Sequence, residues 1–147
     1  METIGTDYED KREEAGETLL DRAIVCCRYA NMPWTLKPDD TAYLNLMAFH
    51  LQQAVELAMR HLLSEGGAPC PETHDIEQLL RIGRANGIDM NADGYIAEHA
   101  EMFSCWRTKA RYQVGYKVEL HKVQAAMTEV RRYLGTIKET EENKQEE

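Results

Sequence analysis

Residues 41–65 read TAYLNLMAFHLQQAVELAMRHLLSE, and this stretch decides the fold class. Its apolar residues recur every three or four positions, which is the spacing of one face of an α-helix. The main apolar stripe consists of Leu44, Met47, Ala48, Leu51, Ala54, Val55, Ala58 and Leu62. Further apolar side chains widen this stripe, and a helix that is apolar over so much of its circumference is usually central in a bundle. Gly66 and Gly67 mark its end, because glycine readily adopts the left-handed conformation that terminates many helices.

Helical spacing continues on both sides of this central segment. The sequence predicts further helices over residues 8–31, 74–86, 93–109 and 117–138. Either Thr73 or Asp75 can cap the segment 74–86, and Asp75 with Gln78 three residues later has the spacing of a capping box. In the segment 8–31, the residues expected on the buried stripe are Ala15, Leu19, Ala23, Cys26 and Ala30.

The predicted architecture is an all-α, up-and-down antiparallel bundle of four to five helices. Loops between the predicted helices are short, so sequential helices should pack antiparallel. Apolar and polar residues do not alternate for long enough to predict a sheet. We expect residues 1–138 to form a single bundle and the acidic residues 139–147 to form a disordered tail.

Composition and charge exclude several classes of protein. The 147-residue chain is 43% hydrophobic and 29% charged, as in a soluble globular protein. It contains no apolar run long enough for a membrane span, and its acidic first residues do not resemble a signal peptide, so we expect a cytoplasmic protein. The formal net charge of −9 argues against broad, non-specific binding to duplex nucleic acid. The four cysteines do not show zinc-site spacing, so we expect reduced thiols and predict no metal or other cofactor.

A local basic stretch interrupts this acidity. Residues 106–122 carry a net charge of +4 and interleave cations with aromatic rings. Guanidinium groups bind phosphates with two parallel hydrogen bonds, and aromatic faces stack on bases. The predicted nucleotide- or RNA-binding residues are Arg107, Lys109, Arg111, Tyr112, Tyr116 and Lys117. The alternative is that Trp106 and one tyrosine belong to the core while the cations form an ordinary solvated face.

The histidines have both structural and chemical interpretations. His50 and His61 are eleven residues apart on one predicted helix, too far to hold one metal ion, and we expect both to be partly buried. His74 is expected to be a helix-start residue. His121 could act as a general base with Arg111 steadying a phosphate, but the helical register predicts that His121 faces solvent. Glu56 and Arg60 are expected to pair on the solvent side of the central helix.

Three short stretches together resemble the HEPN domain family, whose name stands for higher eukaryotes and prokaryotes nucleotide-binding. The first is FHLQQAVE at residues 49–56, followed by apolar residues at Ala58, Leu62 and Leu63. The second is THDIEQLL at residues 73–80, and the third is Ala-Arg-Tyr at residues 110–112. The three occur in the family's order on a helical background, and the resemblance covers roughly residues 40–134.

The resemblance implies a helical bundle that is commonly a homodimer. Some members of the family are toxins that cut RNA without a metal, others are partners of minimal nucleotidyltransferases, and others bind nucleotides. The cutting members carry an arginine, four to six residues and a histidine near the start of the last long helix. In this chain nine residues separate Arg111 from His121, so the spacing departs from that pattern.

The sequence therefore predicts a module that binds a nucleotide, single-stranded RNA or a protein partner, without cleavage. The protein partner would be a second copy of the chain or a minimal nucleotidyltransferase, as in a toxin–antitoxin-type pair. One alternative is a metal-independent endoribonuclease toxin that uses Arg111 and His121 as catalytic residues. A second alternative is a purely structural helical adaptor.

Overall fold

The computed structural model describes residues 18–31, 41–92 and 94–146. Every regular element within these residues is helical, which confirms the predicted all-α bundle. The elements are, in order, α2 (Leu19–Asn31), α3 (Thr41–Glu65), α4 (Ile76–Ala85), α5 (Tyr95–Glu98), α6 (Ala100–Cys105), a π-helical turn η2 (Trp106–Ala110) and α7 (Leu120–Glu146).

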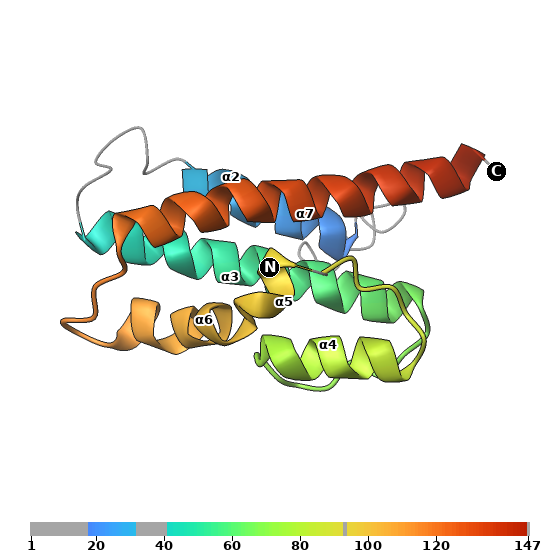
Figure 1. The fold of residues 1–147 in the computed structure, drawn as a ribbon, viewed down its shortest axis with the longest axis horizontal. Coiled ribbons are helices and arrows are strands. Elements are labelled where there is room, and N and C mark those ends of the chain that lie inside the picture. Colours follow the sequence, from blue (N-terminus) through green and yellow to red (C-terminus); the bar gives the residue numbers. More distant parts are fainter. Residues whose placement is uncertain (1–17, 32–40, 93, 147) are drawn as a thin grey trace, which may run out of the picture.

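Helix α3 is the central helix, as its wide apolar surface predicts. It contacts α2 and α7 on one side and α4, α6 and η2 on the other, and Figure 1 shows it between these two layers. Side chains around most of its circumference are fully buried, including those of Met47, Leu51, Val55, Met59 and Leu63. A helix in this position stabilises the fold through contacts in every direction, which explains why its sequence signal is the strongest.

The structure identifies the cap of α4 and corrects the predicted buried face of α2. Of the two predicted caps of α4, Asp75 is the one that the structure shows, because its Oδ1 accepts a hydrogen bond from the backbone N–H of Glu77 at 2.9 Å. On α2 the buried face consists of Leu20, Ala23, Cys27 and Ala30, so the predicted places of Leu19 and Cys26 on the stripe were wrong by one residue. Packing against α3 and α7 fixes this face, and residues 8–17 of the predicted helix lie outside the described part of the chain.

The predicted single helix over residues 93–109 is wrong. The structure instead shows α5 and α6 separated by a break at His99, followed by the turn η2, and residue 93 lies outside the described residues. The ring of His99 stacks on Tyr95 at 3.9 Å, and its Nδ1 lies 2.8 Å from the Tyr95 carbonyl oxygen. The break coincides with the non-helical backbone of His99, which has φ −109° and ψ 17°.

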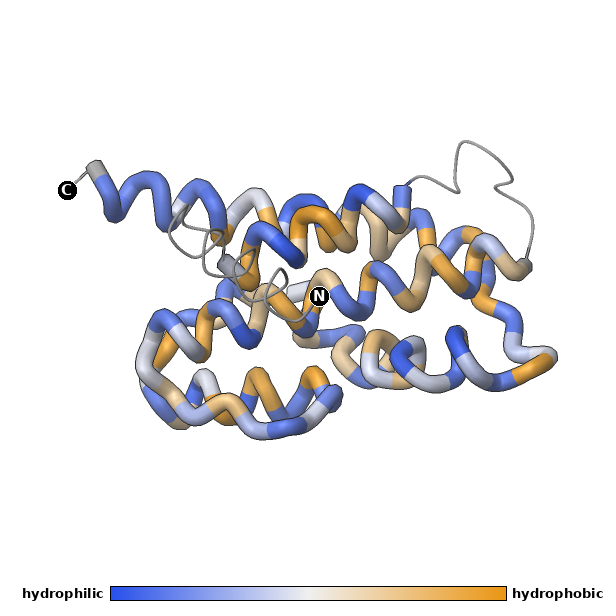
Figure 2. The backbone as a smooth tube through the Cα atoms, turned by 180° about the vertical axis from the view of Figure 1, so that it is seen from behind, coloured by the Kyte–Doolittle hydropathy of each residue, from blue (hydrophilic) through white to orange (hydrophobic). Residues whose placement is uncertain are grey.

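The predicted disordered tail is also wrong for residues 139–146, because α7 continues to Glu146. Figure 2 shows its hydrophilic end running beyond the bundle. Ile137 is fully buried, and one turn later the Nε2 atom of the buried His61 contacts Oε1 of Glu141. These contacts hold the helix on α3, and glutamate and lysine are themselves good helix formers.

None of the described helices is both long and apolar enough to cross a membrane.

Candidate functional site

A groove of about 630 Å³ lies between the first half of α3 and the segment that follows η2. From α3 it is lined by Ala42, Asn45, Leu46 and Phe49, and from the later segment by residues 110–117. The segment includes a turn in which Tyr116 N donates to Gln113 O at 3.2 Å. Gly115 lies in this turn with φ +87°, a conformation that favours glycine. The groove thus brings together residues that are about seventy positions apart in sequence.

Asn45 fixes the position of this segment relative to α3. Its Nδ2 donates to the Tyr116 carbonyl oxygen at 2.7 Å, and its Oδ1 accepts from Val118 N at 3.1 Å. Both bonds are partly shielded from water, and both atoms of the amide are used. One side chain therefore determines where the wall of the groove sits.

We predict that Asn45→Asp loosens this wall. The carboxylate still accepts from Val118 N but cannot donate to the Tyr116 carbonyl, which leaves two oxygens facing each other. The free energy of unfolding in urea should fall by about 1–3 kcal/mol, and amide exchange should quicken in residues 112–118. Asn86→Asp is a control at the exposed end of α4. Unchanged exchange in residues 112–118 of Asn45→Asp would contradict the assigned role of Asn45.

Arg111 and Tyr112 form a cationic and aromatic edge of the groove. The guanidinium carbon of Arg111 lies 4.4 Å from the centre of the Phe49 ring and 5.5 Å from that of Tyr112. Phe49 is buried, whereas Arg111 is exposed and 65% of Tyr112 is accessible to solvent. A guanidinium that rests on an aromatic face is held in one orientation while its N–H groups stay free for a phosphate.

The π-helical turn η2 presents a second arginine to the same ring. Arg107, four residues before Arg111, has its guanidinium carbon 5.9 Å from the centre of Phe49. Trp106 and Ala110 are buried on the other face of this turn. Single π-helical turns occur often at functional sites, because they change which side chains face a neighbouring element.

Only some of the six predicted binding residues line the groove. Arg111, Tyr112, Tyr116 and Lys117 line the groove. Arg107 is half-buried and Lys109 is exposed on η2, and neither is among the residues that line the groove. Trp106 is only 2% exposed and packs edge-on against Phe103 at 5.5 Å, so it belongs to the core, which was the alternative for this residue.

His121 lies on the outer side of α7, as its register predicts. Its side chain is 72% exposed, and its Nε2 lies 3.3 Å from Oε2 of Glu119. It does not line the groove, whereas Arg111 does. Arg111 instead lies over the rings of Phe49 and Tyr112. The two residues of the possible catalytic pair therefore have separate surroundings.

The predicted Glu56–Arg60 pair forms, but it belongs to a buried polar network on α3 that the sequence did not predict. Glu56 was expected on the solvent side, but it is only 5% exposed. Its carboxylate accepts from Gln52 Nε2 at 3.0 Å and from Arg60 Nε at 3.2 Å. Gln53 Nε2 in turn donates to Gln52 Oε1 at 2.8 Å. The carboxylate is thus held by neutral and charged donors from its own helix.

His74 joins this network to the basic segment. Its Nδ1 lies 2.9 Å from Glu56 Oε1, and its Nε2 lies 3.4 Å from Nη2 of Arg107. When Nδ1 carries the proton donated to Glu56, Nε2 is an acceptor for the Arg107 N–H. His74 is 54% exposed, so this chain of contacts reaches the surface. The sequence signal was present, since His74 belongs to the THDIEQLL stretch, but spacing did not reveal its partner.

The pKa of His50 is sensitive to the positive charge of Arg111. Burial lowers the pKa of His50, and the nearby positive charge of Arg111 lowers it further. The ring stacks with Tyr29 at 5.9 Å and meets Phe49 edge-on at 5.7 Å. A neutral imidazole is favoured there, because both causes disfavour the cation.

Comparison with known proteins gives one result that bears on this site. The model of the HEPN domain matches residues 39–141, and the chain belongs to the HEPN domain family. The match extends from α3 into α7, so it includes both the groove and the Glu56 network. No curated protein and no solved structure matches the chain. Membership of this family indicates a nucleotide-binding or RNase-like module.

Within the described residues, no group of three or more histidine, cysteine, aspartate or glutamate side chains is arranged to hold a metal ion.

Proposed function

We propose that this HEPN domain binds a nucleotide or short single-stranded RNA in the groove beside Arg111, without cleaving it. The observation that carries the proposal is the Arg111 guanidinium, which rests on Phe49 at the edge of an open groove. Arg111 would bind a phosphate through two N–H groups, and Tyr112 would stack on a base. Tyr116 and Lys117 complete the same wall.

Arg107 and His74 would extend this site along α3. Arg107 shares the Phe49 ring with Arg111 and approaches His74 on its other side. Its Nε is buried without a hydrogen-bond partner among the described residues, which is a cost that a solvated surface arginine would not have. A second phosphate of an oligonucleotide would lie between these groups, with Lys109 on the exposed side of η2 adding attraction at longer range.

The test is the binding of fluorescently labelled ATP, GTP and a short single-stranded RNA at low salt, followed by anisotropy. We predict that Arg111→Ala weakens binding by about tenfold or more, the loss expected for a charge-assisted bidentate contact. The slope of log affinity against log salt should also become shallower by about 0.7, since one phosphate contact is lost. Arg132→Ala is the matched control, because Arg132 is exposed on α7 and pairs with Glu129. If Arg111→Ala bound the labelled nucleotides and RNA as tightly as the unaltered protein, the proposal would be refuted.

A second readout locates the ligand. A phosphate beside Arg111 offsets the positive charge that lowers the pKa of His50, so binding should raise that pKa in an NMR titration. Arg111→Ala should raise it without ligand, and added RNA should then have little further effect. Binding that leaves the His50 titration unchanged would place the ligand elsewhere.

Cleavage by Arg111 and His121 remains a distinct candidate with a separate test. The exposed position of His121 and its contact with Glu119 favour binding without cleavage. Incubation of the protein with RNA and EDTA should therefore leave the RNA intact, and expression in cells should not arrest growth. RNA fragments that disappear with His121→Ala would replace the binding proposal with an endoribonuclease.

A protein-interaction role is favoured by exposed apolar side chains around the groove. Leu46 is 43% exposed and Val114 99% exposed, next to the accessible ring of Tyr112. We propose that this surface also contacts a protein, either a second copy of the chain in a homodimer or a nucleotidyltransferase partner. Analytical ultracentrifugation over micromolar concentrations should show a dimer that Val114→Asp weakens. A monomer at every concentration would remove the homodimer.

A further inference from the structure

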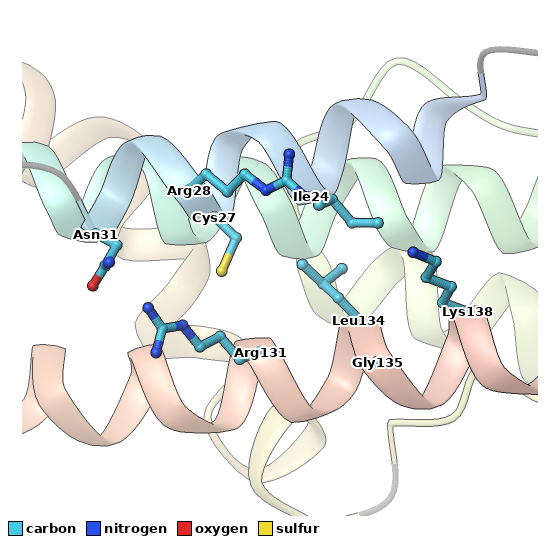
Figure 3. A pocket seen from close by; sticks show the side chains of 8 residues that line it. All are labelled: Ile24, Cys27, Arg28, Asn31, Arg131, Leu134, Gly135 and Lys138. Atoms are coloured by element: carbon cyan, nitrogen blue, oxygen red, sulfur yellow. The ribbon is translucent and has the colours of Figure 1, made fainter.

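A second pocket, of about 340 Å³, lies between α2 and α7 and shares no lining residue with the groove beside Arg111. Figure 3 shows its lining side chains between the two helices. From α2 it is lined by Ile24, Cys27, Arg28 and Asn31, and from α7 by Arg131, Leu134, Gly135 and Lys138. Both sets follow helical spacing, so one face of each helix is turned toward the other.

The middle of the pocket is apolar and is opened by a glycine. Ile24 and Leu134 project between the helices, and the thiol of Cys27 lies on the same side (Figure 3). Apart from its chain neighbours and the adjacent backbone of α7, no described atom would lie within 4 Å of a Cβ added at Gly135, so this position is open space. A side chain at residue 135 would occupy that space, and glycine leaves it free.

Three cations surround this apolar centre. Arg28, Arg131 and Lys138 line the pocket, and none of its lining residues in the described part of the chain is an aspartate or a glutamate. Within the described part of the chain, none of these three cations lies within 4 Å of an Asp or Glu oxygen. Figure 3 places the Arg131 guanidinium toward Asn31 at one end and Lys138 toward the other.

Cys27 does not neutralise this positive charge. Burial raises the pKa of the Cys27 thiol, while a hydrogen bond and the charge of Arg131 act in the opposite direction and are smaller. The thiol therefore stays protonated at neutral pH and behaves as a small apolar group. Arg131 then has its charge available for an acidic group in the pocket.

We propose that this pocket binds a small organic anion with an apolar body, such as an alkyl carboxylate. The apolar body would lie on Ile24, Cys27 and Leu134, and the acidic group would bind Arg131 with the Asn31 amide beside it. Ligand pockets of this volume are typically apolar with a few placed polar groups that fix orientation. The ligand differs from the one proposed for the groove, since the lining residues that the structure describes include no aromatic ring on which a base could stack.

Isothermal titration with octanoate, octan-1-ol and octylamine tests the proposal on the full chain. We expect octanoate to bind, octan-1-ol to bind at least about tenfold more weakly, and octylamine not to bind, because only the carboxylate pairs with Arg131. Equal affinity for octanoate and octan-1-ol would overturn the proposal, because the cations would then contribute nothing.

Two variants assign the binding to this pocket. Arg131→Gln should weaken octanoate binding by about tenfold or more, whereas Arg132→Gln, on the exposed neighbouring residue, should leave it unchanged. Gly135→Leu should abolish binding by filling the open space, and its thermal midpoint should not fall, because leucine favours a helix more than glycine does. Octanoate binding that survives in a folded Gly135→Leu protein would place the ligand elsewhere and refute the proposal.

Discussion

Glu56→Ala is expected to lower the free energy of unfolding by about 3–5 kcal/mol, the largest loss that we predict for a polar side chain in this protein. The Glu56 side chain is 7% exposed and accepts hydrogen bonds from Gln52, Arg60 and His74. Removing the carboxylate leaves the fully buried amide of Gln52 without its acceptor and leaves Arg60 without its ion-pair partner. A buried donor without a partner keeps its full desolvation penalty.

Urea unfolding measures this effect, and Glu77→Ala is the matched control. Glu77 is an exposed glutamate in the first turn of α4, so its removal should change the unfolding free energy by no more than about 0.5 kcal/mol. Arg60 also donates to the carbonyl oxygens of Pro71 and Thr73, so part of its position should survive in Glu56→Ala. A loss below about 1 kcal/mol for Glu56→Ala would mean that water solvates the network and that the network does not hold residues 71–74 against α3.

Trp106→Ala is expected to cost about 3–5 kcal/mol of unfolding free energy. The indole is 2% exposed and packs edge-on against Phe103 with ring centres 5.5 Å apart. Its removal leaves a cavity beneath η2, so Arg107 on this turn and Arg111 directly after it should lose their fixed positions over Phe49. Binding of labelled RNA should therefore weaken together with stability.

Comparing Tyr112→Ala with Trp106→Ala distinguishes an aromatic residue that contacts the ligand from one that packs in the core. Tyr112 is largely exposed, so its removal should change the unfolding free energy by no more than about 0.5 kcal/mol while it weakens RNA binding. Chemical denaturation gives the unfolding free energy of Tyr112→Ala and Trp106→Ala, and anisotropy gives their RNA binding. A Trp106→Ala protein as stable as the unaltered chain would contradict the core assignment of the indole.

The long helices could be predicted because their apolar residues repeat over many turns. The prediction for α3 matches its bounds, and the Asp75 cap of α4 depends on residues within one turn. The segment 93–109 could not be predicted correctly, because the stacking of His99 on Tyr95 and the widened turn at Trp106 do not change the apolar spacing. The helical end of α7 was not predicted, because local composition was misleading there. Its acidic composition resembles a tail, but His61 on α3 contacts Glu141.

The candidate site was predicted in part. The cations and rings of residues 106–117 identified the basic stretch, and the structure places four of the six predicted binding residues along one groove. Neither composition nor spacing could indicate that Asn45 holds this segment to α3 or that Arg111 rests on Phe49. Glu56 was assigned to solvent because an Arg60 partner one turn away is typical of an exposed helix face.

The sequence by itself determined the helical class, the central place of residues 41–65 and the HEPN family, since these depend on local periodicity and on short motifs. Only the tertiary structure decided which polar side chains are buried and which cations share a partner. His74 meets Glu56 from eighteen residues away, and Asn45 meets Tyr116 from seventy-one. Such pairings depend on how the helices pack in space, and hydrogen bonds between groups that the packing shields from water are electrostatically stronger than hydrogen bonds in water.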